Sequence, residues 1–400
     1  MDEKTRGSGD ALVRNAHSAL SEDQAKAAHD IAAAVDSGQL ASVLVGPAGS
    51  GKTTLMQHVM DQFAQKRGCV LLAPTGKAAS VLQSKTGRMA STIHKALFGG
   101  VDEDGEELVF KEPGPPCLAG DLVVVDEASM VGESLHRTLV EQLPKGAQLL
   151  YVGDKEQLPP VNEAWGPNFD SPDAELTQVH RQAEKSPILR LATAIRTRRG
   201  FTGWTDGACE RGTGRPVQWL AERAKGDATL LAYTNKTRRE LNAKVREALG
   251  LHKSIPCIGD RVVCLLNSTA LGIMNGEVAT IDSVRPSAWA SQRYGGDVWV
   301  AELSTGQTAR FNTDLLGASA GAFKRWRDRV KARKGDVDNL LHIDFGWCLT
   351  VHKSQGSEWQ SVGFVADGGY QWLKRKNPDD ARRLAYTAVT RARSELRIFS

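Results

Sequence analysis

Residues 46–53 read Gly-Pro-Ala-Gly-Ser-Gly-Lys-Thr, which is the complete G-x-x-x-x-G-K-[ST] pattern of a phosphate-binding loop. The loop follows an apolar segment, residues 41–45, and opens a segment of helical character, residues 51–67. A loop between a strand and a helix presents backbone N–H groups to an anion, because the first turn of a helix leaves those groups unpaired. The pattern therefore predicts a nucleoside triphosphate site in an α/β domain.

The residues of this loop have distinct expected roles. The glycines let the backbone approach the phosphates, Lys52 reaches the β- and γ-phosphates, and the Thr53 hydroxyl is a ligand for Mg²⁺. The residues that we expect to bind the nucleotide in and beside the loop are Gly46, Pro47, Ala48, Gly49, Ser50, Gly51, Lys52, Thr53 and Thr54.

A second apolar segment, residues 122–125, ends in two carboxylates, Asp126 and Glu127. We expect Asp126 to hold Mg²⁺ through water, and Glu127 to orient and deprotonate the attacking water. Two acids at the end of a strand could also be solvated loop residues. The phosphate-binding loop earlier in the same α/β run favours the catalytic interpretation.

The organisation of the chain is visible in its hydrophobic pattern. Apolar strand-like segments alternate with helical ones from residue 41 to about 152 and again from residue 229, which indicates parallel sheets covered on both faces. Residues 99–119 interrupt the first run and suggest a short β-hairpin around Leu-Val-Phe. Residues 255–342 combine period-2 alternation with glycine-rich turns, which suggests a barrel-like β insertion.

Composition excludes several classes of protein. Apolar residues make up 41% of the chain and charged residues 24%, as in globular rather than disordered proteins. No apolar run approaches the ~20 residues that a membrane helix needs. The six cysteines include no C-x-x-C pair, so free thiols in a reducing cytosol fit better than a disulfide framework or a zinc site. The net charge of +4 permits a nucleic-acid partner without demonstrating one.

Several segments together resemble one family. Residues 126–130 (DEASM) and 153–161 (GDKEQLPPV) are similar to motifs II and III of superfamily 1B DNA helicases of the RecD/Dda kind. Other segments resemble, in the order of that family, its Q-motif (21–24), motif Ia (73–79), motif Ib (91–94), motif IV (179–182), motif V (349–358) and motif VI (386–392). One such match would be weak evidence, but matches in family order over residues 20–400 are strong evidence.

The resemblance implies a fold and a division of the chain. The fold class is α/β, with two RecA-like P-loop domains built on parallel sheets, a small β-hairpin in the first and an SH3-like β-barrel insertion in the second. The expected boundaries are a flexible N-terminal segment (1–19), the first domain (20–165) with a pin at about 100–118, the start of the second domain (166–254), the insertion (255–342) and the remainder of the second domain (343–400).

The resemblance also assigns roles around the nucleotide. Gln24 offers a paired donor and acceptor to the edge of adenine, so ATP is preferred over GTP. Gln157 senses the γ-phosphate from the first domain. Arg181 and Arg391 resemble arginine fingers that spread the charge of the transition state.

A nucleic-acid track is implied along the two domains, where backbone N–H groups, hydroxyls and cations can meet phosphates. The residues of this track are Pro74, Thr75, Lys77, Thr92, His94 and Pro159 in the first domain, and Asn235, Thr350, His352 and Lys353 in the second. The basic segment 322–334 is either a further DNA contact or a solvated helix face, and most of the nine tryptophans are expected in the core.

The implied function is an ATP hydrolase, a DNA helicase that moves 5′→3′ on single-stranded DNA and unwinds duplex, with ATP and Mg²⁺ as cofactors. The expected partners are single-stranded DNA and tailed or forked duplex DNA. We expect a monomer with unknown protein partners, no membrane association, and action in the cytoplasm of a bacterial or phage-infected cell.

Two alternatives remain. An ATP-regulated nucleic-acid clamp or remodeller would bind without processive unwinding, although the intact catalytic set Lys52, Asp126, Glu127, Arg181 and Arg391 argues against it. A relaxase-associated helicase fragment shares these motifs. A relaxase needs a histidine triad and nucleophilic tyrosines upstream, and the short segment before Gln24 is not expected to hold them.

Overall fold

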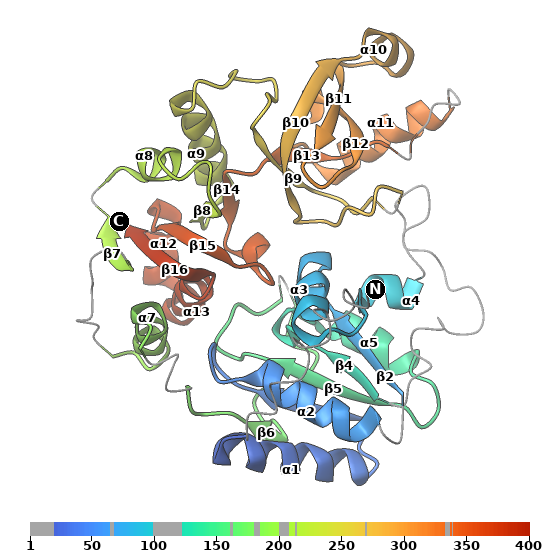
Figure 1. Ribbon diagram of the computed structural model, residues 1–400, viewed down its shortest axis with the longest axis vertical. Helices are drawn as coiled ribbons and strands as arrows, with labels where there is room; N and C mark the ends of the chain where they lie inside the picture. Colours follow the sequence, from blue (N-terminus) through green and yellow to red (C-terminus); the bar gives the residue numbers. More distant parts are fainter. Residues whose placement is uncertain are drawn as a thin grey trace, which may run out of the picture.

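The computed structural model describes residues 20–64, 68–98, 122–160, 163–179, 185–199, 208–212, 214–268, 270–332, 337 and 339–400. These residues form three sheets, each in its own lobe of the molecule (Figure 1). The expected pin at about 100–118 lies outside the described residues. None of the helices in the described ranges is long and apolar enough to cross a membrane.

The first sheet is parallel, in the order β3-β2-β4-β5-β1-β6. Its strands are β1 (Ala41–Val45), β2 (Cys69–Ala73), β3 (Ala90–Thr92), β4 (Leu122–Val125), β5 (Gln148–Gly153) and β6 (Ala174–Glu175). The helices of this lobe are α1 (Glu22–Asp36), α2 (Lys52–Ala64), α3 (Gly76–Thr86), α4 (Ile93–Phe98), the 3-10 turn η2 (Ala128–Met130) and α5 (Glu133–Glu141).

Both faces of this sheet are covered, which is why its strands are apolar at successive positions. Along β1, Leu44 packs with residues of α1 and α2, whereas Val43 and Val45 pack on the other face with residues of α4 and α5. Successive side chains of a strand point to opposite faces, so each of the two layers of helices requires its own apolar residues. The sequence prediction of a parallel, doubly covered sheet is confirmed.

The second sheet is also parallel, in the order β14-β8-β15-β16-β7. Its strands are β7 (Cys209–Gly212), β8 (Ala228–Ala232), β14 (Cys348–Thr350), β15 (Trp359–Val365) and β16 (Ala392–Phe399). The helices around it are α7 (Pro187–Arg196), α8 (Pro216–Ala221), α9 (Asn235–Ala248), the 3-10 turn η4 (His352–Ser354), α12 (Gly368–Lys376) and α13 (Pro378–Val389). One core joins the sheet to α7 and α13, and another joins it to α8 and α9.

The insertion is an antiparallel sheet in the order β12-β11-β10-β9-β13. Its elements are β9 (Arg261–Cys264), β10 (Val278–Pro286), α10 (Ala288–Tyr294), β11 (Val298–Leu303), β12 (Thr308–Asn312), the 3-10 turn η3 (Thr313–Leu315), α11 (Ala320–Ala332) and β13 (Ile343–Phe345). The edges of the sheet approach each other, because the N–H of Arg310 in β12 donates to the carbonyl of Asn339 at 2.6 Å and the N–H of Leu341 donates back to Arg310 at 2.8 Å. This closure gives the barrel-like form that the alternation predicts.

Two strands extend beyond the boundaries drawn from the sequence. Strand β6, at residues 174–175, pairs with β1 of the first sheet, although the first domain was expected to end at residue 165. Strand β13, at residues 343–345, pairs with β9 of the insertion, which was expected to end at residue 342. Both strands are short, and a short strand is recognised by its pairing partner rather than by its own periodicity.

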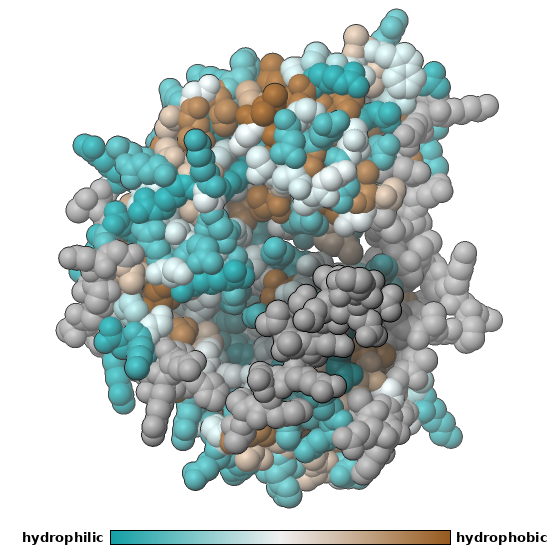
Figure 2. Space-filling model, in the orientation of Figure 1, coloured by the Kyte–Doolittle hydropathy of each residue, from teal (hydrophilic) through white to brown (hydrophobic). Residues whose placement is uncertain are grey.

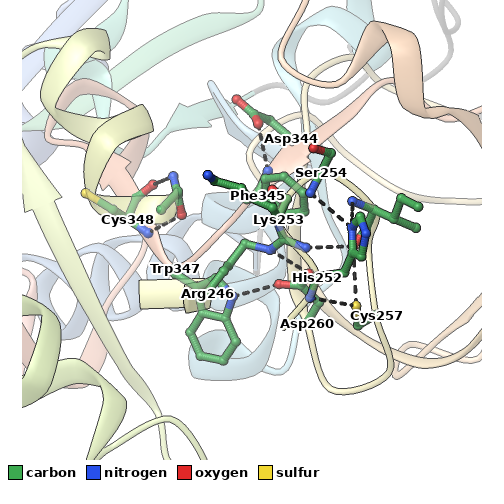
Figure 3. Close-up of polar contacts among 12 residues, drawn as sticks. Arg246, His252, Lys253, Ser254, Cys257, Asp260, Asp344, Phe345, Trp347 and Cys348 are labelled. Atoms are coloured by element: carbon green, nitrogen blue, oxygen red, sulfur yellow. Dashed lines mark hydrogen bonds and ion pairs between the residues drawn. The ribbon is translucent and has the colours of Figure 1, made fainter. Parts of the chain in front are cut away.

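The insertion is anchored to the second lobe by a buried ion pair (Figure 3). The Arg246 guanidinium in α9 donates to the Asp260 carboxylate at 2.9 Å and to the carbonyls of Lys253 and Ile255 at 2.9 and 2.7 Å. The indole N–H of Trp347 donates to the other Asp260 oxygen at 2.7 Å. The residues before β9 and after β13 are thereby held at one point, which fixes where the insertion leaves the second sheet.

The basic segment of the insertion is an amphipathic helix, α11. Phe323, Trp326 and Val330 are buried in a core shared with α10, whereas Arg325 and Arg329 are exposed. On the face shown in Figure 2, hydrophilic side chains cover much of the surface, and hydrophobic ones gather toward the top, over the insertion and the loop that leads into it. The apolar half of α11 is therefore a structural requirement, while the choice between a DNA contact and a solvated face for its basic half stays a prediction.

Candidate functional site

The phosphate-binding loop connects the end of β1 to the start of α2. Gly49 and Gly51 have φ angles of 79° and 81°, a left-handed conformation that residues with a Cβ rarely adopt. The Lys52 ammonium donates to the carbonyls of Gly46 and Pro47 at 2.7 and 3.1 Å. The loop therefore surrounds the Lys52 side chain at the N-terminus of α2, where backbone N–H groups would bind an anion.

A cavity of about 280 Å³ lies beside this loop and is lined by both α/β lobes. From the first lobe, its lining includes Ala48, Gly49, Gly51, Lys52, Thr53, Asp126, Glu127, Asp154 and Gln157. From the second lobe, it includes Gly356, Glu358, Thr390 and Arg391. Five of the six residues expected to be catalytic therefore share one cavity, and the sixth, Arg181, lies outside the described residues.

Asp126 and Glu127 directly follow the end of β4 and line this cavity. Burial and the neighbouring Glu127 raise the pKa of Asp126 to about 6, while Lys52 lowers it. Glu127 itself has a φ of 51°, a conformation that is uncommon for a residue with a side chain and that occurs often at functional sites. Two half-buried carboxylates and the Thr53 hydroxyl provide oxygen ligands of the kind that Mg²⁺ prefers, so the residues present fit this cation.

Gln157 and Arg391 face the same cavity from different lobes. Gln157 is only 4% exposed, and its Oε1 has no hydrogen-bond partner among the described residues. Arg391 is also 4% exposed, and its guanidinium donates to the carbonyl of Thr387, the carbonyl of Ser357 and the hydroxyl of Thr390 at 3.1, 3.3 and 3.2 Å. A buried amide oxygen without a partner beside a cavity indicates a ligand or water site.

Other residues expected to bind the nucleotide lie near the cavity without lining it. Gly46, Pro47, Ser50 and Thr54 belong to the loop and the first turn of α2. Gln24 is buried in α1, where its Oε1 accepts the N–H of Ser21 at 3.1 Å and its Nε2 donates to the carbonyl of Gly51 at 3.3 Å. These bonds join the start of α1 to the phosphate-binding loop, so here the amide positions the loop. Its contact with adenine stays a prediction.

The expected nucleic-acid track begins at the ends of two neighbouring strands of the first sheet. Thr75 follows β2, and its hydroxyl accepts the N–H of Ala78 as the N-cap of α3, at 3.2 Å. Thr92 ends β3 and is buried, with its hydroxyl accepting the N–H of Lys95 at 3.1 Å. The side chains of Lys77 and His94 are exposed at this edge. Pro74 and Pro159 are half-buried.

The second half of the track lies at the corresponding edge of the second sheet. Asn235 is exposed at the start of α9, directly after β8, and Thr350 ends the neighbouring strand β14. Burial lowers the pKa of His352, whose ring lies against Tyr233 with centroids 6.3 Å apart. Burial also lowers the pKa of Lys353, and Arg238 lowers it further. These residues lie at or just after the ends of β8 and β14, and their contact with nucleic acid stays a prediction.

The two halves meet at a close contact between the lobes. Gly356 has a φ of 71°, and a Cβ added there would lie 2.8 Å from the Ala78 Cβ and 3.1 Å from the Thr75 hydroxyl. From the insertion, Met274 packs against Gly76 so closely that a Cβ on this glycine would overlap it. Beside this contact, a polar cavity of about 300 Å³ is lined by the first lobe, including Lys77, Thr92 and Lys95, and by the insertion, including Met274. The two halves of the candidate track are thus in contact at Gly356 and Thr75.

Sequence reasoning missed the residues that join the lobes beside the cavity. Tyr386, Thr387 and Asp154 lie within the segments that resemble motifs III and VI, but their residue types alone gave no indication of a role. In the structure, all three are buried and hydrogen-bonded across the interface between the lobes.

Comparisons with known proteins agree with this arrangement. Residues 19–204 match the family model described as an AAA domain, and residues 345–399 match that of a UvrD-like helicase C-terminal domain. The chain is 32% identical over 406 aligned residues to the ATP-dependent RecD2 DNA helicase of Deinococcus radiodurans, covering 98% of the chain and 50% of that protein. It is 29% identical over 253 residues to the ATP-dependent DNA helicase dda of Enterobacteria phage T4, covering 58% of the chain and 57% of the relative. The chain thus spans about half the length of these relatives.

Solved structures support the fold. A Pif1 helicase from Bacteroides, in complex with ADP-AlF3 and single-stranded DNA, aligns with a TM-score of 0.52 at 18% identity, over 95% of the chain and 92% of that structure. A Pif1 structure from a study of unwinding at forked duplex DNA aligns with a TM-score of 0.54 at 19% identity, over 95% of the chain and 91% of its own. At this identity the likeness establishes the fold of two RecA-like domains.

Proposed function

Because the chain belongs to the RecD/Dda/Pif1 group of superfamily 1B, we propose that it is an ATP-dependent DNA helicase that moves 5′→3′ on single-stranded DNA. One observation carries this proposal: Lys52, Asp126 and Glu127 of the first lobe share a cavity with Arg391 of the second. A nucleotide bound there contacts both lobes, so its hydrolysis changes how the lobes are held together.

The residues of the cavity divide the chemistry among them. Lys52 and the loop N–H groups bind the phosphates, and Thr53 and Asp126 hold Mg²⁺, which neutralises phosphate charge when bound. Glu127 accepts the proton of the attacking water, and Gln157 orients that water or the γ-phosphate. Arg391 stabilises negative charge that develops in the transition state, and Arg181 is proposed to act with it.

The track at the sheet edges supplies the proposed DNA site. Lys77 and Asn235 are exposed, one in each lobe, and the closely packed contact between Gly356 and Thr75 joins the two halves. The exposed Lys77 and the N-termini of α3 and α9 at these edges suit a phosphate backbone rather than a base-specific contact. Alternating contact of each lobe with the strand, as the cleft closes on ATP and reopens, gives directional movement.

The proposed substrates are single-stranded DNA and tailed or forked duplexes, with the protein acting as a monomer. The test is unwinding of duplexes that carry a 5′ or a 3′ single-stranded tail, together with ATPase assays with and without oligonucleotide. We expect unwinding of the 5′-tailed duplex and ATP turnover that rises with DNA. The Lys52→Ala variant, which lacks the charge at the phosphates, should do neither.

Two results would contradict the proposal. DNA-stimulated turnover without unwinding of any tailed duplex would favour the ATP-regulated clamp instead. Unwinding of the 3′-tailed duplex alone would refute the direction.

A further inference from the structure

A tyrosine hydroxyl is buried between the two α/β lobes. Tyr386 lies on α13 of the second lobe and is 1% exposed. Its Oη accepts the N–H of Ala48, in the phosphate-binding loop, at 2.9 Å. The same hydroxyl donates to the Asp154 carboxylate, at the end of β5, at 2.7 Å. One side chain of the second lobe is therefore bonded to two segments of the first, and both of these segments line the nucleotide cavity.

Neighbouring residues of α13 bind the loop that follows Asp154. The Thr387 hydroxyl accepts the N–H of Leu158 at 3.1 Å, and both residues are buried. Arg382 forms an ion pair with Glu156. Residues 154–158 thus follow the surface of α13, with contacts at their beginning, middle and end. Gln355, from the segment after η4, adds a bond to the Leu158 carbonyl at 3.2 Å.

These contacts are directly connected to the groups around the cavity. Gln157, which lines the cavity, precedes Leu158 in the loop that Thr387 holds. The carbonyl of the same Thr387 accepts the Nε–H of Arg391 at 3.1 Å. Gln157 of the first lobe and Arg391 of the second are therefore both positioned through Thr387 of α13.

We propose that Tyr386 is a positioning residue, whose hydroxyl joins the phosphate-binding loop and the Asp154–Leu158 loop to α13 so that Gln157 and Arg391 are placed together. This inference rests on the proposed ATP hydrolysis at the same cavity and adds the element that couples closure of the lobes to assembly of the site. Tyr386 itself does not line the cavity.

The chemistry of a phenol suits this position. A hydroxyl accepts one hydrogen bond while it donates another, whereas a phenylalanine ring of the same shape does neither. Burial and the nearby Asp154 raise the pKa of Tyr386 well above its usual value, so the hydroxyl keeps the proton that it donates. Burial also raises the pKa of Asp154, opposed by Lys52 and by the bond from Tyr386. Without Tyr386, this carboxylate would lose its donor from the second lobe.

The test compares two matched variants, Tyr386→Phe and Tyr151→Phe. Tyr151 is equally buried and its hydroxyl also has a hydrogen bond, to His136 at 2.8 Å, but this pair lies wholly within the first lobe. Each variant removes one oxygen and keeps the ring. ATP turnover with saturating oligonucleotide is measured beside the affinity for a fluorescent ATP analogue and for single-stranded DNA.

We expect Tyr386→Phe to lower kcat by about 10- to 100-fold, the range for losing a hydrogen bond to a charged group. The affinities for nucleotide and for DNA should change less than about threefold, because each ligand is bound mainly by residues within the individual lobes. A threefold change in affinity is about 0.65 kcal/mol. Tyr151→Phe should leave kcat near that of the wild type. If the Tyr386 hydroxyl were only structural, both variants would lower the stability of the fold, and Tyr386→Phe would not lower kcat while leaving nucleotide and DNA affinity nearly unchanged.

A kcat for Tyr386→Phe within about twofold of the wild type would overturn the inference. Nucleotide affinity that falls as far as kcat would also overturn it, because the hydroxyl would then serve binding. Should Tyr386→Phe fail to fold, Thr387→Val removes the acceptor for Leu158 and is expected to show the same split. The wild-type control separates the two proposals. If the wild type shows no DNA-stimulated ATP turnover, the proposed function fails. If the wild type is active and Tyr386→Phe has the same kcat, only this inference is refuted.

Discussion

Arg391 offers the sharpest test of a site shared between the lobes. A guanidinium has five N–H donors. Three of them bond to Thr387, Ser357 and Thr390, and the remaining two have no partner among the described residues. Because Arg391 lines the nucleotide cavity, these two donors are available to a phosphate. The change Arg391→Gln removes the charge and the paired donors while keeping a polar side chain.

The expected magnitude follows from this arrangement. An arginine of this kind contributes about 10³–10⁵ in rate, which is roughly 4–7 kcal/mol of transition-state stabilisation. Nucleotide in the ground state is held mainly by Lys52 and the loop, so its affinity should fall far less. Arg375→Gln is the matched control, since Arg375 is exposed on α12 of the same lobe. Arg375→Gln should leave both ATP turnover and nucleotide affinity unchanged.

Stopped-flow binding of a fluorescent ATP analogue and steady-state ATPase with saturating oligonucleotide measure the two quantities separately. The Arg391→Gln variant should bind DNA, bind nucleotide and turn over at least about 10³-fold more slowly. A loss smaller than about tenfold would show that Arg391 does not act on the transition state. An equal loss of nucleotide affinity would show that it serves ground-state binding, and either result would refute the reasoning.

Four further predictions concern chemistry, DNA binding and stability. Glu127→Gln should lower turnover by about 10²–10⁴ in ATPase assays while nucleotide titration shows retained affinity; a loss below tenfold would exclude Glu127 as the base. Affinity for single-stranded DNA should fall with salt, and Lys77→Gln should reduce the log–log slope by about 0.7; an unchanged slope would remove Lys77 from the track. Arg246→Leu should lower the free energy of unfolding by about 3–5 kcal/mol in urea titrations, because Asp260 is left buried without its partner; a neutral result would contradict this. Burial lowers the pKa of His342, so the folded protein binds fewer protons than the unfolded chain, and stability should be lost as pH falls below about 6.5. His342→Gln should weaken that dependence in thermal unfolding, whereas His29→Gln at the surface should not.

Short-range patterns in the sequence predicted several of the residues that line the candidate nucleotide cavity. The phosphate-binding loop and the Asp126-Glu127 pair lie next to apolar strands, so local periodicity was enough to place them at the ends of β1 and β4. For Gln24 the structure adds contacts that the sequence did not indicate, because its amide is bonded to Ser21 and Gly51, while its contact with adenine stays a prediction. The type of a side chain determines which hydrogen bonds it can form, but its neighbours in the folded protein determine which of them do form.

The sequence by itself determined two doubly covered parallel sheets, a β-rich insertion and the order of the motifs, since each depends on residues close together in the chain. Only the tertiary structure decided that the 174–175 strand joins the first sheet, that the insertion closes through Arg310 and Asn339, and that Tyr386 bonds to Ala48. Ala48 and Tyr386 are 338 residues apart, and no local pattern records such a pairing. Contacts of this range form when the apolar faces of both lobes are buried together, so they are fixed by packing of the whole chain.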